Sequence, residues 1–375
     1  MRNSLGRSSS THGSSMPIVR LLVPAALLFP TAVNGQATWR IDTIPILTIP
    51  AVSDAGEVNF GTAVGATRLA NGDVVIADGT VGAIVRFSPA GAMRGRSGGE
   101  GAGPGEFRTL WWMGQCGVDS LWAHDLNEPR LSLFAGEGTF LRQVLPPSPA
   151  GLVRCGATGQ LALLTIGPPP SSGGTTVRPP ADLYAMKPTL EFVKLRTGVP
   201  ATEFAMVGSM PVPFPLGRTT VVAVRGTETI LGVADSAVLE RIGPQGQSLG
   251  LIRLPATARA PTAREAADAA DALLTRVPTA AREYLAPLLE QIPPPPQLPP
   301  YFGLWVDSGG RLWVQRSPPG APVRFTVVSP TGAPLAEASA PITFTPLEVD
   351  VDGILALVER QDGELAVALL PVHQK

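Results

Sequence analysis

A repeat of nearly 50 residues constrains the fold of this chain more than any other feature of its sequence. An offset of 47 residues aligns Asp78 with Asp125 and Phe87 with Phe134. Repeats of this length are typical of stacked supersecondary units. Each unit begins with two apolar segments joined by a tight polar turn, the pattern of a β-hairpin. Six such turns follow one another, at 71–73, 118–120, 158–160, 226–228, 309–311 and 352–353.

A second kind of turn separates a third from a fourth segment, at 88–91, 243–246 and 329–332. Four antiparallel strands per unit, repeated six times, predict an all-β fold, a six-bladed β-propeller. A β-sandwich is the rival, but it gives no reason for the period. The last unit shows only three strands, and the strand expected at 39–49 has no unit of its own. We therefore expect these two ends to pair and to cover edges that would otherwise invite aggregation.

Two insertions interrupt the repeat, a loop at 168–180 and a segment at 261–296. The second is the only stretch with helical periodicity. Thr262 and Glu265 form a capping box for a first helix, and Pro278 separates it from a second. Strand order places this insertion on the face that carries the loops between second and third strands. There it either covers a site as a lid or packs on the outer rim.

The first 35 residues indicate export. Arg20 precedes an apolar run from Leu21 to Val33, and small residues follow, as in a cleaved signal peptide. Prolines interrupt the run, and it is shorter than the roughly 20 apolar residues of a membrane-spanning helix. Met1 and Met16 are alternative starts. We expect a secreted or periplasmic monomer without a transmembrane anchor after cleavage, and with the propeller at 36–375.

The charge of the chain argues against a nucleic-acid partner. The formal charge is −1, and it becomes −4 without the leader, which holds three arginines and no acid. A nucleic-acid surface would show a clustered basic stripe. The hydrophobic fraction of 44% supplies ample material for a core.

One stretch of the second unit resembles an NHL-repeat blade. It comprises Gly103-Pro104-Gly105-Glu106-Phe107 and the run from Asp125 through Arg130 to Phe134. The resemblance is fair over the first unit and fades in units three to six. It implies a six-bladed propeller that is used mostly for binding, with some enzymes among its relatives. In this motif Asp125 and Arg130 look structural, tying a loop to the neighbouring blade.

No catalytic constellation is specific enough to identify a reaction. The chain has only three histidines, His12, His124 and His373, so a zinc site built mainly from histidines is not expected. The stretch 307–310 is similar to the surroundings of a serine-protease nucleophile but coincides with a hairpin turn. A calcium site at the propeller axis remains an alternative, because carboxylates and carbonyl oxygens are the ligands that calcium prefers. Otherwise we expect no cofactor.

Polar side chains from the loops between second and third strands should converge on one face. A mixed set of this kind suits a polar or anionic small molecule. Arg316 and Arg360 lie on adjacent units and are placed to hold a carboxylate, unless they are ordinary solvated charges. His124 is either part of this site or hydrogen-bonded inside a blade. The candidate residues are Asp78, His124, Asp125, Asp235, Arg316, Arg360 and Asp362.

Cys116 and Cys155 end the first strands of adjacent units and should lie side by side. In an oxidising compartment they form a disulfide, unless neighbouring blades hold their Cα atoms beyond the roughly 7 Å limit. Taken together, the sequence favours an exported propeller that binds a small molecule or a protein at the cell envelope. The alternative is a calcium-dependent, lactonase-like hydrolase acting at the axis.

Overall fold

The computed structural model describes residues 37–53, 56–167, 176–255, 258–275, 277 and 279–374. The chain divides into two units, 1–35 and 36–375, and the expected leader lies outside the described residues. The described part is built almost entirely from antiparallel sheets, which confirms the all-β prediction. None of the helices in this part is both long and apolar enough to cross a membrane.

Four sheets of the described residues have four strands each, paired mostly in chain order. The second strands are the most deeply buried, because apolar residues fill both of their faces. The strands are β3 (Ala63–Arg68), β4 (Val74–Asp78), β5 (Ala83–Phe87) and β6 (Met93–Gly98); β7 (Leu110–Gln115), β8 (Ser120–Asp125), β9 (Arg130–Ala135) and β10 (Phe140–Val144); β11 (Ala150–Cys155), β12 (Leu161–Thr165), β14 (Pro180–Met186) and β15 (Phe192–Pro200); and β18 (Val221–Arg225), β19 (Glu228–Gly232), β20 (Val238–Ile242) and β21 (Ser248–Arg253).

A nine-stranded sheet joins the N-terminal strands to the C-terminal third of the chain. Its order is β22-β23-β24-β25-β1-β28-β27-β26, and β2 pairs with β28 beside this path. The strands are β22 (Gly303–Val306), β23 (Leu312–Gln315), β24 (Arg324–Val328), β25 (Pro334–Ser339), β26 (Thr345–Val349), β27 (Gly353–Glu359), β28 (Leu365–His373), β1 (Ala37–Ile41) and β2 (Leu47–Pro50).

The two ends of the chain pair, but not through the single strand expected at 39–49. That segment breaks after Ile41, where Asp42 Oδ1 accepts hydrogen bonds from the backbone N–H groups of Thr43 and Ile44, at 2.8 and 3.3 Å. An aspartate that bonds the backbone ahead of it favours a turn over a continuing strand. As a result β2 supplies the outer partner of β28, whereas β1 runs parallel to β25 and joins two groups of strands.

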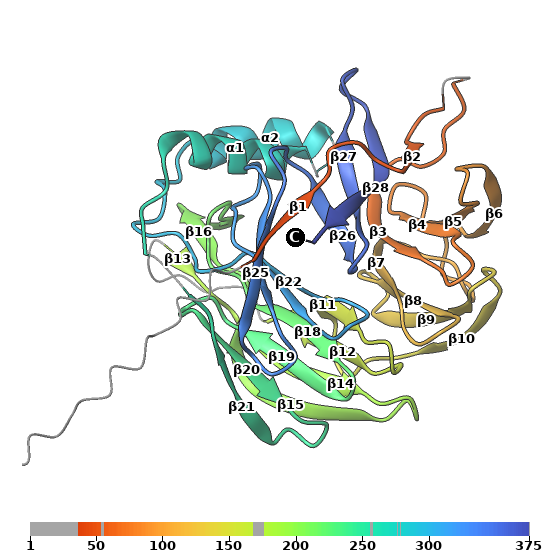
Figure 1. Ribbon diagram of the computed structural model, residues 1–375, viewed down its shortest axis with the longest axis horizontal. Helices are drawn as coiled ribbons and strands as arrows, with labels where there is room; N and C mark the ends of the chain where they lie inside the picture. The colour runs from red at the N-terminus through yellow and green to blue at the C-terminus, as the bar shows by residue number, and fades with distance from the viewer. Residues whose placement is uncertain are drawn as a thin grey trace, which may run out of the picture. The chain divides into compact units, whose positions relative to one another are not determined.

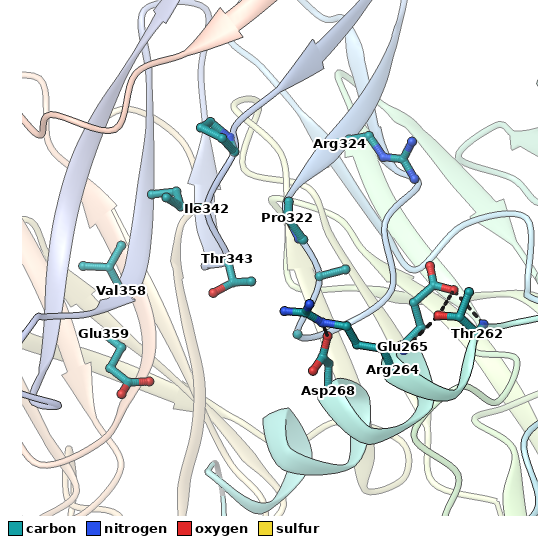
Figure 2. A pocket seen from close by; sticks show the side chains of 13 residues that line it. Thr262, Arg264, Glu265, Asp268, Pro322, Arg324, Ile342, Thr343, Val358 and Glu359 are labelled. Carbon is teal, nitrogen blue, oxygen red and sulfur yellow. Dashed lines mark hydrogen bonds and ion pairs between the residues drawn. The ribbon is translucent and has the colours of Figure 1, made fainter.

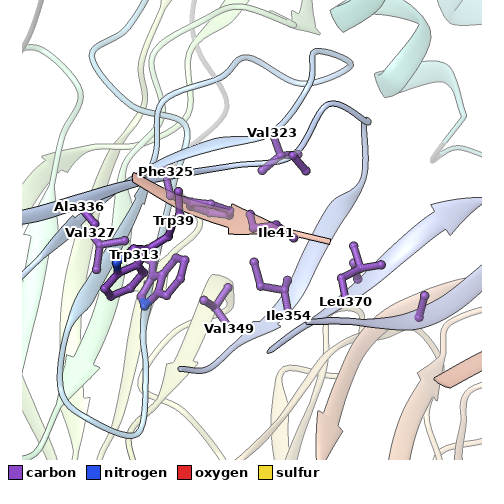
Figure 3. Close-up of a cluster of buried hydrophobic side chains, with 14 residues drawn as sticks. Trp39, Ile41, Trp313, Val323, Phe325, Val327, Ala336, Val349, Ile354 and Leu370 are labelled. Carbon is purple, nitrogen blue, oxygen red and sulfur yellow. The ribbon is translucent and has the colours of Figure 1, made fainter. Parts of the chain in front are cut away.

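The core lies mostly between neighbouring sheets. Of six clusters of buried apolar side chains in the described residues, five draw on two adjacent sheets and one lies within the nine-stranded sheet. Figure 3 shows the cluster in which Trp39 and Ile41 of β1 pack with Trp313, Phe325 and residues of the last strands. The first strands touch in a cycle, β3 to β7, β11, β18, β22, β26 and back to β3.

The predicted hairpin turns have the backbone that their glycines permit. Gly72, Gly159 and Gly310 have φ of +82°, +81° and +74° in turns between first and second strands. Gly91 and Gly246 have φ of +82° and +83° between third and fourth strands. Glycine has no Cβ and adopts this left-handed region without steric cost. The glycines in the sequence therefore predict where these turns lie.

The predicted helical insertion contains α1 (Ala263–Leu274) and α2 (Thr279–Leu289). The capping box is confirmed, because Thr262 Oγ1 accepts from Glu265 N while the Glu265 carboxylate accepts from Thr262 N. Pro278 lies outside the described residues, as does most of the expected loop at 168–180. The helices contact each other, and α2 reaches a small sheet (Figure 1) made of β13 (Thr176–Val177), β16 (Phe204–Val207) and β17 (Met210–Pro213).

Candidate functional site

The start of α1 is fixed rigidly by local chemistry. Arg259 Nη1 donates to Glu265 Oε2 at 2.8 Å, and the same carboxylate accepts from Thr262. The hydrogen bond from Arg259 holds the pKa of Glu265 at about 2, so this carboxylate is ionised throughout the physiological range. A negative charge in the first turn also favours the helix dipole.

The helix docks on the loop between β23 and β24 through Gly320. This glycine has φ of +78°, and a Cβ at this position would collide with the backbone oxygen of Asp268 in α1. The backbone of the loop therefore lies directly against the helix, at a distance that only glycine permits. The insertion thus sits beside a loop between second and third strands, on the face where the strand order placed it.

A cavity of about 840 Å³ lies where α1 meets three loops or strand ends. Its walls are α1, the β23–β24 loop, the connection from β25 to β26, and the end of β27. Figure 2 shows the apolar residues Pro322, Ile342 and Val358 between charged groups from different elements. Apolar walls with a few charged groups are the usual composition of a small-molecule site.

Some charged side chains of this cavity form ion pairs with other residues of the protein, and others do not. Arg264 pairs with Asp268 at 3.6 Å within α1, and Glu265 is held by Arg259. In the part of the chain that the structure describes, neither Arg324 nor Glu359 has a hydrogen-bonding or ionic partner for its side chain. Both side chains are exposed, and Figure 2 shows them on different walls of the cavity. One cation and one anion are therefore free to contact a bound molecule.

The structure places the predicted site residues Asp78 and His124 inside the protein. Asp78 is buried, and its Oδ1 accepts from the backbone of Thr80 at 2.9 Å. His124 is fully buried, with Nε2 2.8 Å from the oxygen of Ala150 and Nδ1 3.2 Å from that of Arg130. The bonds of these side chains are with backbone groups, and neither residue lines the cavity.

Asp125 and Arg130 tie a loop in the way that the NHL resemblance implies. Asp125 accepts from the backbone N–H groups of Arg108 and Thr109 at 2.7 and 3.1 Å, and lies 3.5 Å from Arg130 Nη2. Arg130 in turn donates to backbone oxygens of the β6–β7 connection, those of Ala102 and Glu106, at 2.8 and 2.7 Å. The pair holds the entry to β7, so its structural role is confirmed.

Asp235 belongs to an ionic cluster that the sequence did not predict. Arg178 and Arg218 each donate to its Oδ1 at 2.9 Å, and Arg218 also binds Glu203 at 2.8 Å. The Glu203 hydrogen bond raises the pKa of Arg218, whereas burial lowers the pKa of Arg178. Two cations and two anions balance here, and the cluster joins the end of the 168–180 insertion to the β19–β20 loop.

Arg316 and Arg360 are engaged by different partners. Arg316 Nη2 donates to the backbone oxygen of Pro255 at 2.6 Å, and burial lowers its pKa. Arg360 pairs with Asp362 at 3.1 Å within one turn. Arg360 directly follows Glu359 in the cavity wall, so it flanks the cavity. The charged residues that line the cavity without a partner, Arg324 and Glu359, were not among the predicted site residues. Arg324 begins β24, directly after the β23–β24 loop, and Glu359 ends β27, directly before the loop to β28.

The described residues contain no group of three or more His, Cys, Asp or Glu side chains arranged to hold a metal ion. The three asparagines among residues 36–375 are each hydrogen-bonded. Asn59 donates to the oxygen of Pro50, Asn71 to Asp73, and Asn127 to Thr109. Ser308 of the 307–310 turn donates to Asp350 at 2.6 Å rather than to a histidine.

Cys116 and Cys155 are joined by a disulfide, with their Cα atoms 5.2 Å apart. The bridge links the end of β11 to the residue after β7.

Solved structures of other proteins have the same arrangement of sheets. A member of the DUF4221 family from Bacteroides vulgatus aligns with a TM-score of 0.55 and 11% identity over 91% of this chain and 100% of that one. A candidate exported protein from Bacteroides fragilis aligns with a TM-score of 0.51 and 14% identity over 92% and 98%. The fold is a β-propeller. Radial sheets whose first strands touch in a cycle define that architecture.

At these identities the likeness extends to the fold alone. A virginiamycin B lyase from Staphylococcus aureus aligns at a TM-score of only 0.43, with 11% identity over 90% of this chain and 95% of that one. No protein-family model matches the sequence, and no curated protein does. The NHL resemblance therefore stays a prediction from the second unit.

Proposed function

We propose that this chain is an exported, six-bladed β-propeller that binds a small polar molecule in the cavity between α1 and the last two blades. The observation that carries the proposal is the cavity of about 840 Å³, in which Arg324 and Glu359 are exposed on different walls. Asp78, Asp235 and Arg316, which were predicted for this face, already have protein partners. Arg324 and Glu359 are available to a ligand.

The number of blades is supported by the cycle of first strands. β3, β7, β11, β18, β22 and β26 each touch the next, and β26 touches β3. The nine-stranded sheet divides into two blades in this interpretation, bridged by β1 between β25 and β28. Export is supported by the apolar leader and the disulfide, which is typical of oxidising compartments.

The charges of the cavity indicate the class of ligand. Arg324 favours a carboxylate or another oxyanion, and Glu359 favours an ammonium group. Pro322, Ile342 and Val358 offer apolar contact between them. A zwitterionic molecule with an apolar part, such as an amino acid or a short peptide, matches this pattern. Arg316 lies close enough to Arg324 to feel its charge and adds positive charge near the carboxylate of such a ligand, whereas Arg360 pairs with Asp362 beside Glu359.

The proposal is tested with a thermal-shift screen of amino acids, di- and tripeptides and organic acids, followed by titration of the best compound. Arg324→Ala and Glu359→Gln should each weaken its binding by at least tenfold. Arg253→Ala is the matched control, because Arg253 is also exposed but lies on the outer strand β21. Unchanged affinity in both cavity variants contradicts this site. Stoichiometric calcium in the purified protein would instead favour the lactonase-like hydrolase.

A further inference from the structure

Trp111 exposes 48% of its surface, whereas Trp39, Trp122 and Trp313 are buried. Tryptophan is usually buried over most of its surface, because its ring system is large and mostly apolar. Exposed apolar side chains that gather in one place mark binding sites. An indole that stays in solvent is therefore available to a ligand.

The backbone departs from regular pairing at Trp111. The register between β7 and β8 shifts between Leu110 and Trp112, so Trp111 has no partner on β8. The neighbouring first strands shift at the same level, at Val64 of β3 and Gly151 of β11. Such β-bulges re-aim side chains and are common beside functional sites.

The indole is held in one orientation, with its apolar ring exposed. Trp111 Nε1 donates to the backbone oxygen of Gly151 on the next first strand, at 3.3 Å. Ile166 borders the same glycine, because a Cβ at position 151 would lie 3.3 Å from Ile166 Cγ1. The Ile166 side chain is itself 52% exposed. An aromatic ring whose polar edge already has its partner offers a ligand its flat apolar face.

Two pairs of uncharged polar side chains have equivalent places in the first two sheets. Thr80 Oγ1 donates to Thr62 Oγ1 at 3.2 Å, and Asn127 Nδ2 donates to Thr109 Oγ1 at 2.7 Å. Thr62, Thr80 and Asn127 are exposed. After these bonds, the hydroxyl protons of Thr62 and Thr109 and the amide oxygen of Asn127 remain for a ligand.

Both pairs lie next to the strand that carries Trp111. Thr109 precedes Trp111 by two residues. Gly79, the neighbour of Thr80, lies against the backbone oxygens of Leu110 and Thr62, since a Cβ there would be 3.3 and 3.6 Å from them. Hydrogen-bonding groups and an exposed indole therefore share this part of the surface.

The charged side chains of the same loops already have partners. Arg108 Nε donates to Glu128 Oε1 at 3.0 Å. Asp78 and Asp125 are buried, and both accept from backbone N–H groups. The groups left for a ligand are neutral, which favours a molecule that carries hydroxyl groups and an apolar face but no charge.

We propose that Trp111 is the stacking platform of a carbohydrate-binding site on the first three sheets. The C–H groups on the flat face of a pyranose ring carry a small positive charge and match the negative face of the indole. The hydroxyl groups at the edge of the sugar match the free donors and acceptors of Thr62, Thr109 and Asn127. This site is separate from the cavity under α1, whose walls do not include Trp111.

The test titrates the full exported chain with a set of neutral di- to hexasaccharides of glucose, galactose, mannose and N-acetylglucosamine. At least one should bind saturably. Trp111→Ala should weaken its binding at least tenfold, and Trp111→Phe should recover most of the loss, because phenylalanine keeps an aromatic face. Leu141→Ala is the matched control, since Leu141 is equally exposed but lies on the outer strand of the same sheet. Thermal unfolding without saccharide verifies that each variant is folded.

Thr62→Val removes a hydroxyl but keeps the shape of the side chain, and it should weaken binding at least threefold. Arg324→Ala should leave saccharide binding unchanged, which separates this site from the proposed cavity. The proposal is overturned if no saccharide of the set binds, or if Trp111→Ala binds as tightly as the wild type. Unchanged affinity in Thr62→Val overturns the polar half of the site.

Discussion

Glu348 should make the protein less stable as the pH rises through neutrality. The residue lies on β26, where Thr67 Oγ1 donates to Oε2 and Arg68 N lies 3.3 Å from both carboxylate oxygens. These partners belong to β3, at the seam where the end of the chain meets its beginning. Burial, opposed in part by these hydrogen bonds and by the charge of Arg68, raises the pKa of Glu348 to about 7.

The direction of this pH dependence follows from proton binding by Glu348 in the folded and the unfolded protein. Between its ordinary pKa of 4.5 and about 7, Glu348 holds its proton in the folded protein but not in the unfolded chain. The free energy of unfolding therefore falls as the pH rises across this window and levels off above it. The difference in pKa corresponds to about 3 kcal/mol once the carboxyl is fully ionised in both states.

Glu348→Gln removes this titration while keeping an oxygen that accepts from Thr67. The variant should match the wild type near pH 5 and exceed it near pH 8.5 by up to about 3 kcal/mol, or roughly 5 °C in the unfolding midpoint for a domain of this size. Urea unfolding and calorimetry at half-unit pH steps measure the difference. Titration of the histidines cancels, because both proteins share them.

Glu137→Gln, at an exposed turn, is the matched control and should show no such divergence. Stability curves of wild type and Glu348→Gln that stay parallel from pH 5 to pH 8.5 would refute the argument. A loss of stability in the variant that is equal at every pH would show instead that the carboxylate serves only as a hydrogen-bond acceptor.

Three further predictions concern the scaffold. Replacing Cys116 and Cys155 by alanine should destabilise the protein by about 4 kcal/mol, because the bridge closes a loop of 39 residues, and reductant should lower the midpoint of the wild type only. Arg130→Met should cost about 3–5 kcal/mol, since it leaves Asp125 buried without its cation, and Asp125→Asn combined with it should recover part of that loss in urea unfolding. Tyr301→Phe should cost about 1–3 kcal/mol in the same assay, because the Tyr301 hydroxyl is the acceptor for a buried backbone N–H at 2.8 Å, and an unchanged midpoint would show that water replaces it.

The face of the propeller that carries the cavity was predictable, but the residues of the cavity were not. Strand order puts the loops between second and third strands on one face, and the insertion at 261–296 packs there. Within those loops the sequence prediction favoured Asp78 and Asp125. Their carboxylates already accept hydrogen bonds from backbone N–H groups, that of Thr80 for Asp78 and that of Arg108 for Asp125. Arg324 and Glu359 carry no local signal, because an unpaired charge is recognised only when every neighbour is known.

The sequence by itself determined the features that depend on residues close together in the chain. Gly72 and Gly310 define hairpin turns, and Thr262 and Glu265 cap α1, because backbone geometry and hydrogen bonding within a few residues decide both. The tertiary structure alone decided which distant segments meet. The parallel pairing of β1 with β25 and the bond from Thr67 to Glu348 arise when the two ends of the chain come together. Residues separated by hundreds of positions gain their partners, or fail to gain them, only through the packing of whole sheets, and no local pattern records that outcome.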